Sequence, residues 1–139
     1  MQDNRQKMTY DLEALEEQIS ALLEASDQGA AIIVEGMRDM RALRALGIRG
    51  PIILASRQPA LRLAEDAARK YKEIIVLTDW DKKGDEMARL IDQHLRSEGI
   101  RADLDIRGRL KKLVRKEIKD VESLSLYVER MREINGMSK

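Results

Sequence analysis

Three short apolar runs that alternate with helical patterns constrain the fold of this chain more than any other feature. The runs are rich in β-branched residues and lie at 30–36, 52–54 and 73–79, and each is followed by apolar residues at helical spacing. Strands that alternate with helices form βαβ units, in which the strands are parallel and helices cover both faces of the sheet. The sequence therefore predicts an α/β fold.

A weaker run at residues 102–106 predicts a fourth strand, so we expect a parallel sheet of about four strands flanked by helices. We expect a single domain over residues 1–139, with its core at about 30–106. Extra helices are expected at the N-terminal side, at 9–25, and at the C-terminal side, within 109–134. The complete set of predicted helices is 9–25, 37–47, 59–71, 85–98, 109–118 and 121–134.

The composition excludes several classes of function. The chain of 139 residues contains no cysteine, which rules out disulfides, zinc–thiolate sites and thiol nucleophiles. Its 26 basic and 25 acidic residues give a formal net charge of +1, so the overall charge does not by itself predict a nucleic acid or membrane partner. No apolar run approaches the roughly 20 residues that span a membrane, and the first residues lack the apolar core of a signal peptide. We therefore expect a cytoplasmic protein without a membrane partner.

Acidic residues follow two of the predicted strands directly. Glu35 comes at the carboxyl end of the first strand, and Asp79 and Asp81 come at the carboxyl end of the third. In open α/β sheets, ligands bind outside the carboxyl ends of the strands. If the first and third strands are neighbours, the three carboxylates converge on one edge of the sheet.

Converging carboxylates repel one another, and a bound cation relieves that repulsion. Oxygen ligands without cysteine or a nearby histidine favour one or two Mg²⁺ or Mn²⁺ ions, which commonly bind together with substrate phosphates. Gly36 and Gly84 follow the acidic positions, where they would let the backbone turn and let a phosphate approach closely. The alternative is that these carboxylates only cap helices, which a D-x-D sequence after a buried run does not favour.

Two motifs together resemble the Toprim domain. They are "VEGMRD" at 34–39 and "LTDWDKKGDEMARLI" at 77–91. Toprim is the catalytic module of type IA and type II topoisomerases, bacterial-type primases, certain recombination-repair proteins, overcoming-lysogenization-defect nucleases and the ribosomal RNA maturation nuclease. Its signature is a glutamate after the first strand and a D-x-D after the third, and the resemblance covers residues 30–106.

The resemblance implies a role for each acidic position. Glu35 would serve as general acid/base and help to bind metal, and Asp79 and Asp81 would be metal ligands. Asp39 matches an acidic position that supports the metal ligands without binding the metal directly; the alternative is that Asp39 lies on the exposed side of its helix. Some Toprim nucleases carry a further acidic residue late in the chain, which makes Glu122 a candidate extra ligand.

The sequence also departs from the larger Toprim enzymes. It shows no domain with an active-site tyrosine, no zinc-binding motif and no ATPase half. In layout it is similar to small stand-alone Toprim proteins, particularly archaeal ones, and among characterised members to the ribosomal RNA maturation nuclease.

A basic amphipathic segment at 106–119 is a candidate nucleic-acid contact. The commoner explanation of such a segment is a solvated basic face, but its lysines and arginines could also bind phosphates. Arg38 lies close to Glu35 in sequence, and Arg57 lies in the loop after the second strand, where a guanidinium could bind a phosphate with two hydrogen bonds. The candidate phosphate contacts are therefore Arg38, Arg57, Lys111, Lys112 and Arg115, together with Gly36 and Gly84.

Local structure explains three other residues near these motifs. Trp80, between the two aspartates, is expected to pack against a neighbouring helix. Asp85 lies in the first turn of a predicted helix, where the helix dipole favours an acidic residue. Asp120 is expected to cap the last helix.

The function that the sequence favours is Mg²⁺-dependent cleavage or transfer of a phosphodiester in RNA or DNA by a nuclease. Water would attack the phosphorus while Glu35 assists proton transfer. The alternative is a non-catalytic module that binds metal and nucleic acid or a partner protein, within a homodimer or a larger complex. A phosphotransfer or phosphatase fold shares the strand-end aspartates but needs a lysine or threonine after a later strand, which the sequence does not place.

Overall fold

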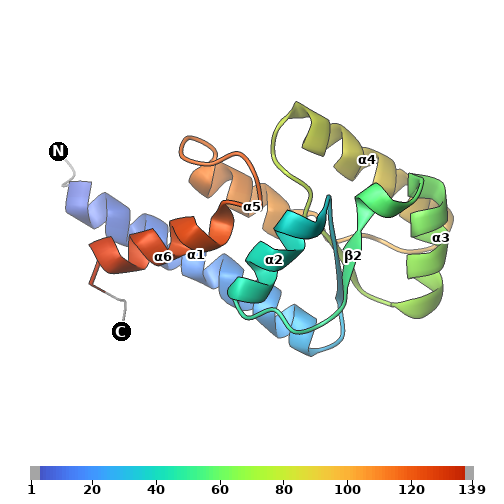
Figure 1. The fold of residues 1–139 in the computed structure, drawn as a ribbon, viewed down its shortest axis with the longest axis horizontal. Coiled ribbons are helices and arrows are strands. Elements are labelled where there is room, and N and C mark those ends of the chain that lie inside the picture. Colours follow the sequence, from blue (N-terminus) through green and yellow to red (C-terminus); the bar gives the residue numbers. More distant parts are fainter. Residues whose placement is uncertain (1–3, 137–139) are drawn as a thin grey trace.

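The protein folds around a small parallel sheet. A computed structural model describes residues 4–136, with side chains from residue 11 onward. The strands are β1 (Ala31–Val34), β2 (Ile52–Leu54) and β3 (Ile74–Val76), and their order in the sheet is β2-β1-β3. Both neighbours of β1 are parallel to it, which confirms the predicted α/β class. Figure 1 shows the helices arranged around this sheet.

The helices agree in number with the prediction but differ at their ends. The fifth helix begins four residues earlier than predicted, and the sixth begins three residues later. The helix after the third strand begins at Lys82, directly after its N-cap Asp81. The helices are α1 (Asn4–Asp27), α2 (Met37–Ala45), α3 (Ala60–Lys70), α4 (Lys82–Ser97), α5 (Asp105–Val114) and α6 (Leu124–Ile134), with a 3-10 turn, η1 (Ala55–Arg57), after β2.

The predicted fourth strand at 102–106 is wrong. Asp103 forms a single parallel bridge with Ile75, and the chain then leaves the sheet. The carboxylate of Asp103 accepts a hydrogen bond of 2.8 Å from the main-chain N–H of Asp105, where α5 begins. A short polar side chain that bonds to the backbone two residues later favours a turn over a strand. The sheet of the described residues therefore has three strands.

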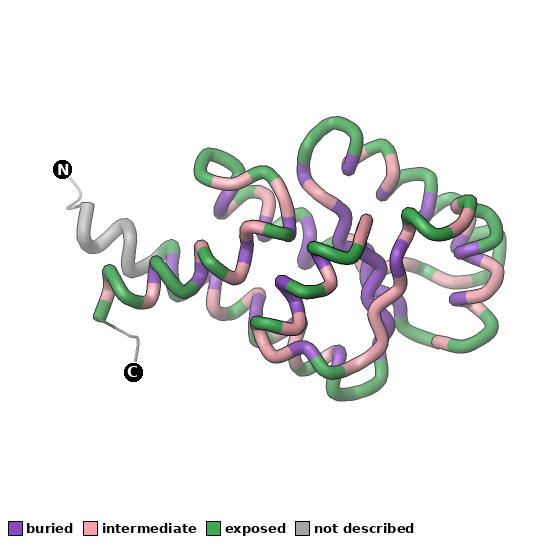
Figure 2. Tube along the Cα trace, viewed as in Figure 1, coloured by how far each residue is buried: buried purple, intermediate pink, exposed green. Residues whose placement is uncertain are grey.

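The two faces of the sheet carry separate apolar clusters. Ile32 and Val34 point to the face that α1, α2, α5 and α6 cover, whereas Ile33 points to the face that α3 and α4 cover. This alternation follows from the two-residue period of a strand. Figure 2 shows the buried segments concentrated where the sheet meets these helices.

The C-terminal helix packs along the N-terminal one, as Figure 1 shows. Arg132 on α6 donates two hydrogen bonds, of 2.8 and 2.7 Å, to the carboxylate of Glu16 on α1. The apolar side of the last segment lies in the core; its buried residues are Val121, Leu124, Val128 and Met131. None of the described helices combines the length and the apolar character that crossing a membrane requires.

The strand order places the candidate site. Residues Ile32 and Ile33 of β1 pair with Ile75 and Val76 of β3, so these strands are direct neighbours. The condition for the carboxylates to meet is therefore fulfilled: Glu35 and Asp79 follow adjacent parallel strands at the same edge of the sheet.

Candidate functional site

A hydrogen bond joins the ends of β1 and β3. One carboxylate oxygen of Glu35 accepts the main-chain N–H of Asp79 at 2.8 Å. The main-chain carbonyl of Glu35 also accepts the N–H of Ser56, which ties the end of β2 to the same point. The three strand ends are thus held together around Glu35, whose side chain is partly exposed.

The carboxylate of Asp79 lies in unfavourable surroundings for a negative charge. Burial raises the pKa of Asp79 from 3.8 to about 7, with the nearby carboxylates of Asp39, Glu35 and Asp120 adding to the rise and a hydrogen bond from the Val121 N–H opposing it. That hydrogen bond is 2.9 Å long and reaches Oδ1. Negative charges therefore crowd this edge of the sheet, which favours a proton or a cation there.

Asp39 belongs to the same group. Its side chain is only 7% exposed, and its carboxylate accepts the N–H of Gly36 at 3.0 Å, at the start of α2. Burial is the largest cause of its raised pKa, and the carboxylates of Glu35, Asp120 and Glu122 raise it further. Asp39 thus both caps its helix and adds to the negative charge around Asp79.

Asp81 takes a different position from Asp79. It is the N-cap of α4, and its Oδ1 accepts the N–H of Gly84 at 2.7 Å. Asp81 is exposed, so its second oxygen can still reach a ligand at the surface. One carboxylate oxygen of Asp81 therefore caps a helix, as the alternative explanation holds, and the other oxygen does not.

The two glycines near these acids differ in their surroundings. A Cβ on Gly84 would lie 1.7 Å from the carbonyl oxygen of Asp79, so close packing requires glycine there. Thr78 adds to this packing by donating its hydroxyl to the Gly84 carbonyl at 2.8 Å. Gly36 has extended backbone angles, and apart from its chain neighbours nothing lies within 4 Å of a Cβ placed there, so the space beside the Gly36 backbone is open.

Arg107 fixes the turn that carries Asp79. Its guanidinium is buried and donates to the carbonyl of Thr78 at 2.9 Å, to the carbonyl of Asp79 and to the carboxylate of Asp85. Lys111 donates to the other oxygen of Asp85 at 2.8 Å, and the two cations lower the pKa of this carboxyl. Sequence reasoning placed Arg107 on a solvated basic face and missed this role, because its acceptors lie far away in the sequence.

The connection between α5 and α6 passes over the same turn. Trp80 is only 4% exposed; its indole N–H donates to the carbonyl of Ile118 at 2.8 Å, and its main-chain N–H bonds to the carbonyl of Lys119 at 3.3 Å. The tryptophan packs as predicted. These bonds bring Asp120 and Glu122 to the edge that holds the other carboxylates.

Sequence reasoning gave Asp120 only a capping role. Its carboxylate does cap the backbone, since it accepts the N–H of Ser123 at 2.9 Å, but it also lies close enough to Asp39 and Asp79 to raise the pKa of both. No local sequence signal separates these two roles. Glu122 is exposed and forms an ion pair of 3.8 Å with Arg38.

The other candidate phosphate contacts differ in how exposed their side chains are. Arg57 is exposed in η1, directly after β2. Lys112 and Arg115 are exposed near the end of α5, whereas Lys111 is partly covered and paired with Asp85.

The chemistry of these side chains fits a hard divalent cation. The donors are carboxylate oxygens with no sulfur, as Mg²⁺ and Mn²⁺ prefer. Among the described residues, no three acidic or histidine side chains already enclose a single point. Mg²⁺ usually keeps several waters and binds one or two carboxylates, so Glu35 and Asp79 are sufficient to begin such a site.

Comparison with known proteins identifies the same family that the two sequence motifs resemble. A family model of the Toprim domain matches residues 30–122. A UPF0292 protein of Methanosarcina barkeri is 46% identical over 121 residues, which cover 87% of this chain and 85% of that protein. One from Thermococcus gammatolerans is 46% identical over 99 residues, covering 70% and 74%. A solved structure of a protein from Aquifex aeolicus superimposes with a TM-score of 0.68 at 30% identity, covering 78% of this chain and 96% of that one.

Proposed function

This chain belongs to the Toprim family, and from that premise we propose that it cleaves phosphodiester bonds in RNA or DNA with Mg²⁺ or Mn²⁺. Toprim membership associates the chain with metal-dependent processes on nucleic acid. Nuclease activity is the more specific step that we propose here.

The observation that carries this proposal is the negative edge formed by Glu35 and Asp79. A hydrogen bond joins the two residues, and the pKa of Asp79 rises to about 7 because of burial and neighbouring carboxylates. A fold gains no stability from such crowding, so the cluster is better explained by a cation that binds there. The open space beside Gly36 supports access of a phosphate to the same edge.

Each side chain has a proposed role. Glu35, Asp79 and Asp81 hold one or two divalent ions, with Asp39 and Glu122 as supporting or additional acids. A bound ion would supply Lewis acidity and orient the phosphate. Glu35 takes the proton from the attacking water, because one of its oxygens is anchored by the Asp79 N–H and its partly exposed side chain reaches solvent.

Basic residues on both sides of this edge would hold the phosphate backbone. Arg38 and Arg57 lie after β1 and β2, and their exposed guanidinium groups suit a phosphate that approaches past Gly36. Lys111, Lys112 and Arg115 would bind phosphates on the α5 side. Gly84 contributes indirectly, since it allows the close packing that shapes the turn.

One observation favours a non-catalytic binding module as the second candidate. Asp39 and Asp81 each use an oxygen to cap a helix, which leaves fewer oxygens for metal. A module of this kind would bind metal and nucleic acid, or a partner protein, without cleaving a substrate.

Cleavage of end-labelled structured RNA and single-stranded DNA, with Mg²⁺ or Mn²⁺, tests the proposal. The wild type is compared with Glu35→Gln and Asp79→Asn. Matched controls are Glu98→Gln and Asp66→Asn, which change the same groups at the end of α4 and on α3.

We expect metal-dependent cleavage by the wild type and by both controls, and a loss of at least about 100-fold in the two site variants. Nucleic-acid binding without cleavage on every substrate would support the binding module instead. Equal cleavage by all five proteins would indicate a contaminating nuclease and would refute the assigned roles.

A further inference from the structure

A basic groove lies beside the exposed aspartate of the D-x-D turn. Its volume is about 430 Å³, and it extends from the start of α4 to the connection between α5 and α6. Figure 1 shows that this connection runs close to the start of α4. The groove is lined by Trp80, Asp81, Lys82, Lys111, Arg115, Lys116 and Lys119.

Most of the positive charge in this groove is not neutralised. Lys111 is paired with Asp85. Among the side chains of residues 11–136, no ion pair involves any of the other four cations of the groove, all of which are exposed. Asp81 is the single acidic residue in the lining. The groove therefore presents four available cations to an anion.

Hydrogen bonds fix the groove relative to the carboxylates. Trp80 donates from its indole to Ile118 and from its backbone to Lys119, and Val121 donates to Asp79. The segment that carries the cations is thus attached to the turn that carries Asp79 and Asp81. A ligand in the groove lies next to Asp81 without any movement of the backbone.

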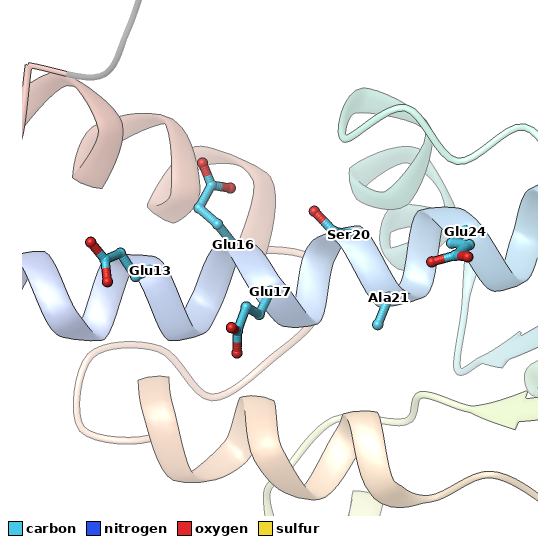
Figure 3. A pocket seen from close by; sticks show the side chains of 6 residues that line it. All are labelled: Glu13, Glu16, Glu17, Ser20, Ala21 and Glu24. Atoms are coloured by element: carbon cyan, nitrogen blue, oxygen red, sulfur yellow. The ribbon is translucent and has the colours of Figure 1, made fainter.

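The hollow along α1 gives a useful contrast. It is larger, at about 560 Å³, but four glutamates line it. Figure 3 shows Glu16 pointing toward α6, where it pairs with Arg132, and Glu17 pointing the opposite way. Such a lining repels a phosphate, so size alone does not choose the ligand; charge selects the basic groove.

Building on the function proposed above, we propose that this groove binds the nucleic-acid backbone next to the phosphate that the carboxylates process. The bound nucleic-acid strand would run from Glu35 and Asp79, past Asp81, toward Arg115 and Lys119. Lys82 thereby joins the candidate contacts, and Lys116 and Lys119, which belong to the basic segment at 106–119, gain a defined position beside the carboxylates.

The arrangement favours a nucleic acid over an acidic protein. Phosphates carry charge at regular intervals along a strand, which suits a groove that continues from a metal-binding edge. Trp80 is buried beneath the groove, so base stacking contributes nothing and only the backbone is recognised. Binding should therefore depend on salt and little on base sequence.

Binding without metal isolates the groove from the carboxylates. A fluorescein-labelled single-stranded oligonucleotide is titrated in EDTA with the wild type and with the double variant Arg115→Gln, Lys119→Gln, at several salt concentrations. The matched control is Arg69→Gln, Lys70→Gln at the far end of α3, which removes the same two charges.

We expect the groove variant to bind at least about 10-fold more weakly than the wild type, and its salt slope to be smaller in magnitude by about 1.4, because two phosphate contacts are lost. The α3 control should match the wild type. Equal affinity and slope in all three proteins would overturn the proposal, as would groove-dependent binding of polyglutamate without binding of the oligonucleotide.

Different results would refute the groove proposal and the nuclease proposal. Loss of binding in the groove variant supports the groove even if the wild type cuts no substrate, which would refute the nuclease alone. Metal-dependent cleavage by a groove variant with unchanged binding would refute the groove and leave the nuclease intact. Circular dichroism of each variant verifies that the fold is kept.

Discussion

Replacing Asp79 with asparagine should stabilise the metal-free protein at alkaline pH. Asparagine has nearly the same shape and keeps an oxygen that can accept the Val121 N–H, whose bond to Asp79 is 2.9 Å. It removes the charge that burial and the carboxylates of Asp39, Glu35 and Asp120 disfavour. A side chain that the proposed function requires is thus expected to cost stability when no cation is bound.

The magnitude follows from the pKa. A rise from 3.8 in the unfolded chain to about 7 in the folded protein corresponds to about 4 kcal/mol for a fully buried charge. Asp79 is partly exposed, so solvent screening reduces this to about 1–2 kcal/mol.

The sign follows from proton binding. Between the two pKa values the folded state holds the proton and the unfolded state does not, so stability falls as pH rises from about 4 to about 7. The destabilisation is absent below that window and complete above it.

Thermal unfolding in EDTA at pH 5 and pH 8 measures this effect. We expect Asp79→Asn to raise Tm by about 3–8 °C at pH 8 and by much less at pH 5. Asp66→Asn, at a surface ion pair on α3, should change Tm by less than about 2 °C. A variant no more stable than the wild type at pH 8, or equally stabilised at both pH values, would refute the reasoning.

Three further substitutions probe the turn that carries the D-x-D motif, each by urea unfolding in EDTA. Gly84→Ala should lower the free energy of unfolding by at least about 3 kcal/mol, because the new Cβ would overlap the Asp79 carbonyl. The control Gly108→Ala, on α5, has open space around its Cβ and should be neutral or stabilising. Equal effects of the two substitutions would contradict the close packing at Gly84. Arg107→Met should cost about 2–4 kcal/mol by leaving two carbonyls and a carboxylate without their donor, and a loss under 1 kcal/mol would mean that this guanidinium is dispensable. Trp80→Phe removes the indole N–H donated to the α5–α6 connection and should cost about 1–3 kcal/mol, a prediction that unchanged stability would exclude.

Hydrophobic periodicity predicted the elements of this fold well where the segments are long or fully buried. The three strands that form are continuous apolar runs, and all the predicted helices exist. The exception is the segment around Asp103, where a side-chain bond to the backbone of Asp105 ends the pairing after one bridge. Alternating apolar residues alone do not reveal that competition.

The candidate site, too, could be predicted from the sequence only in part. The adjacency of Glu35 and Asp79 followed from their places after parallel strands, once the strands were known to be neighbours. The roles of Arg107 and Asp120 could not be predicted, because each depends on contacts across 22 or more positions of the chain. Charge patterns in a sequence give the composition of a face but not its partners.

Direct titration of Mn²⁺, followed by electron paramagnetic resonance, tests most directly whether the edge formed by Glu35 and Asp79 is a metal site. We predict one or two bound ions per wild-type chain, and affinity reduced at least about 10-fold in Glu35→Gln and in Asp79→Asn, with Glu98→Gln unchanged. Equal Mn²⁺ affinity in all four proteins, or no binding by the wild type, would contradict the assignment of this edge as a divalent-metal site.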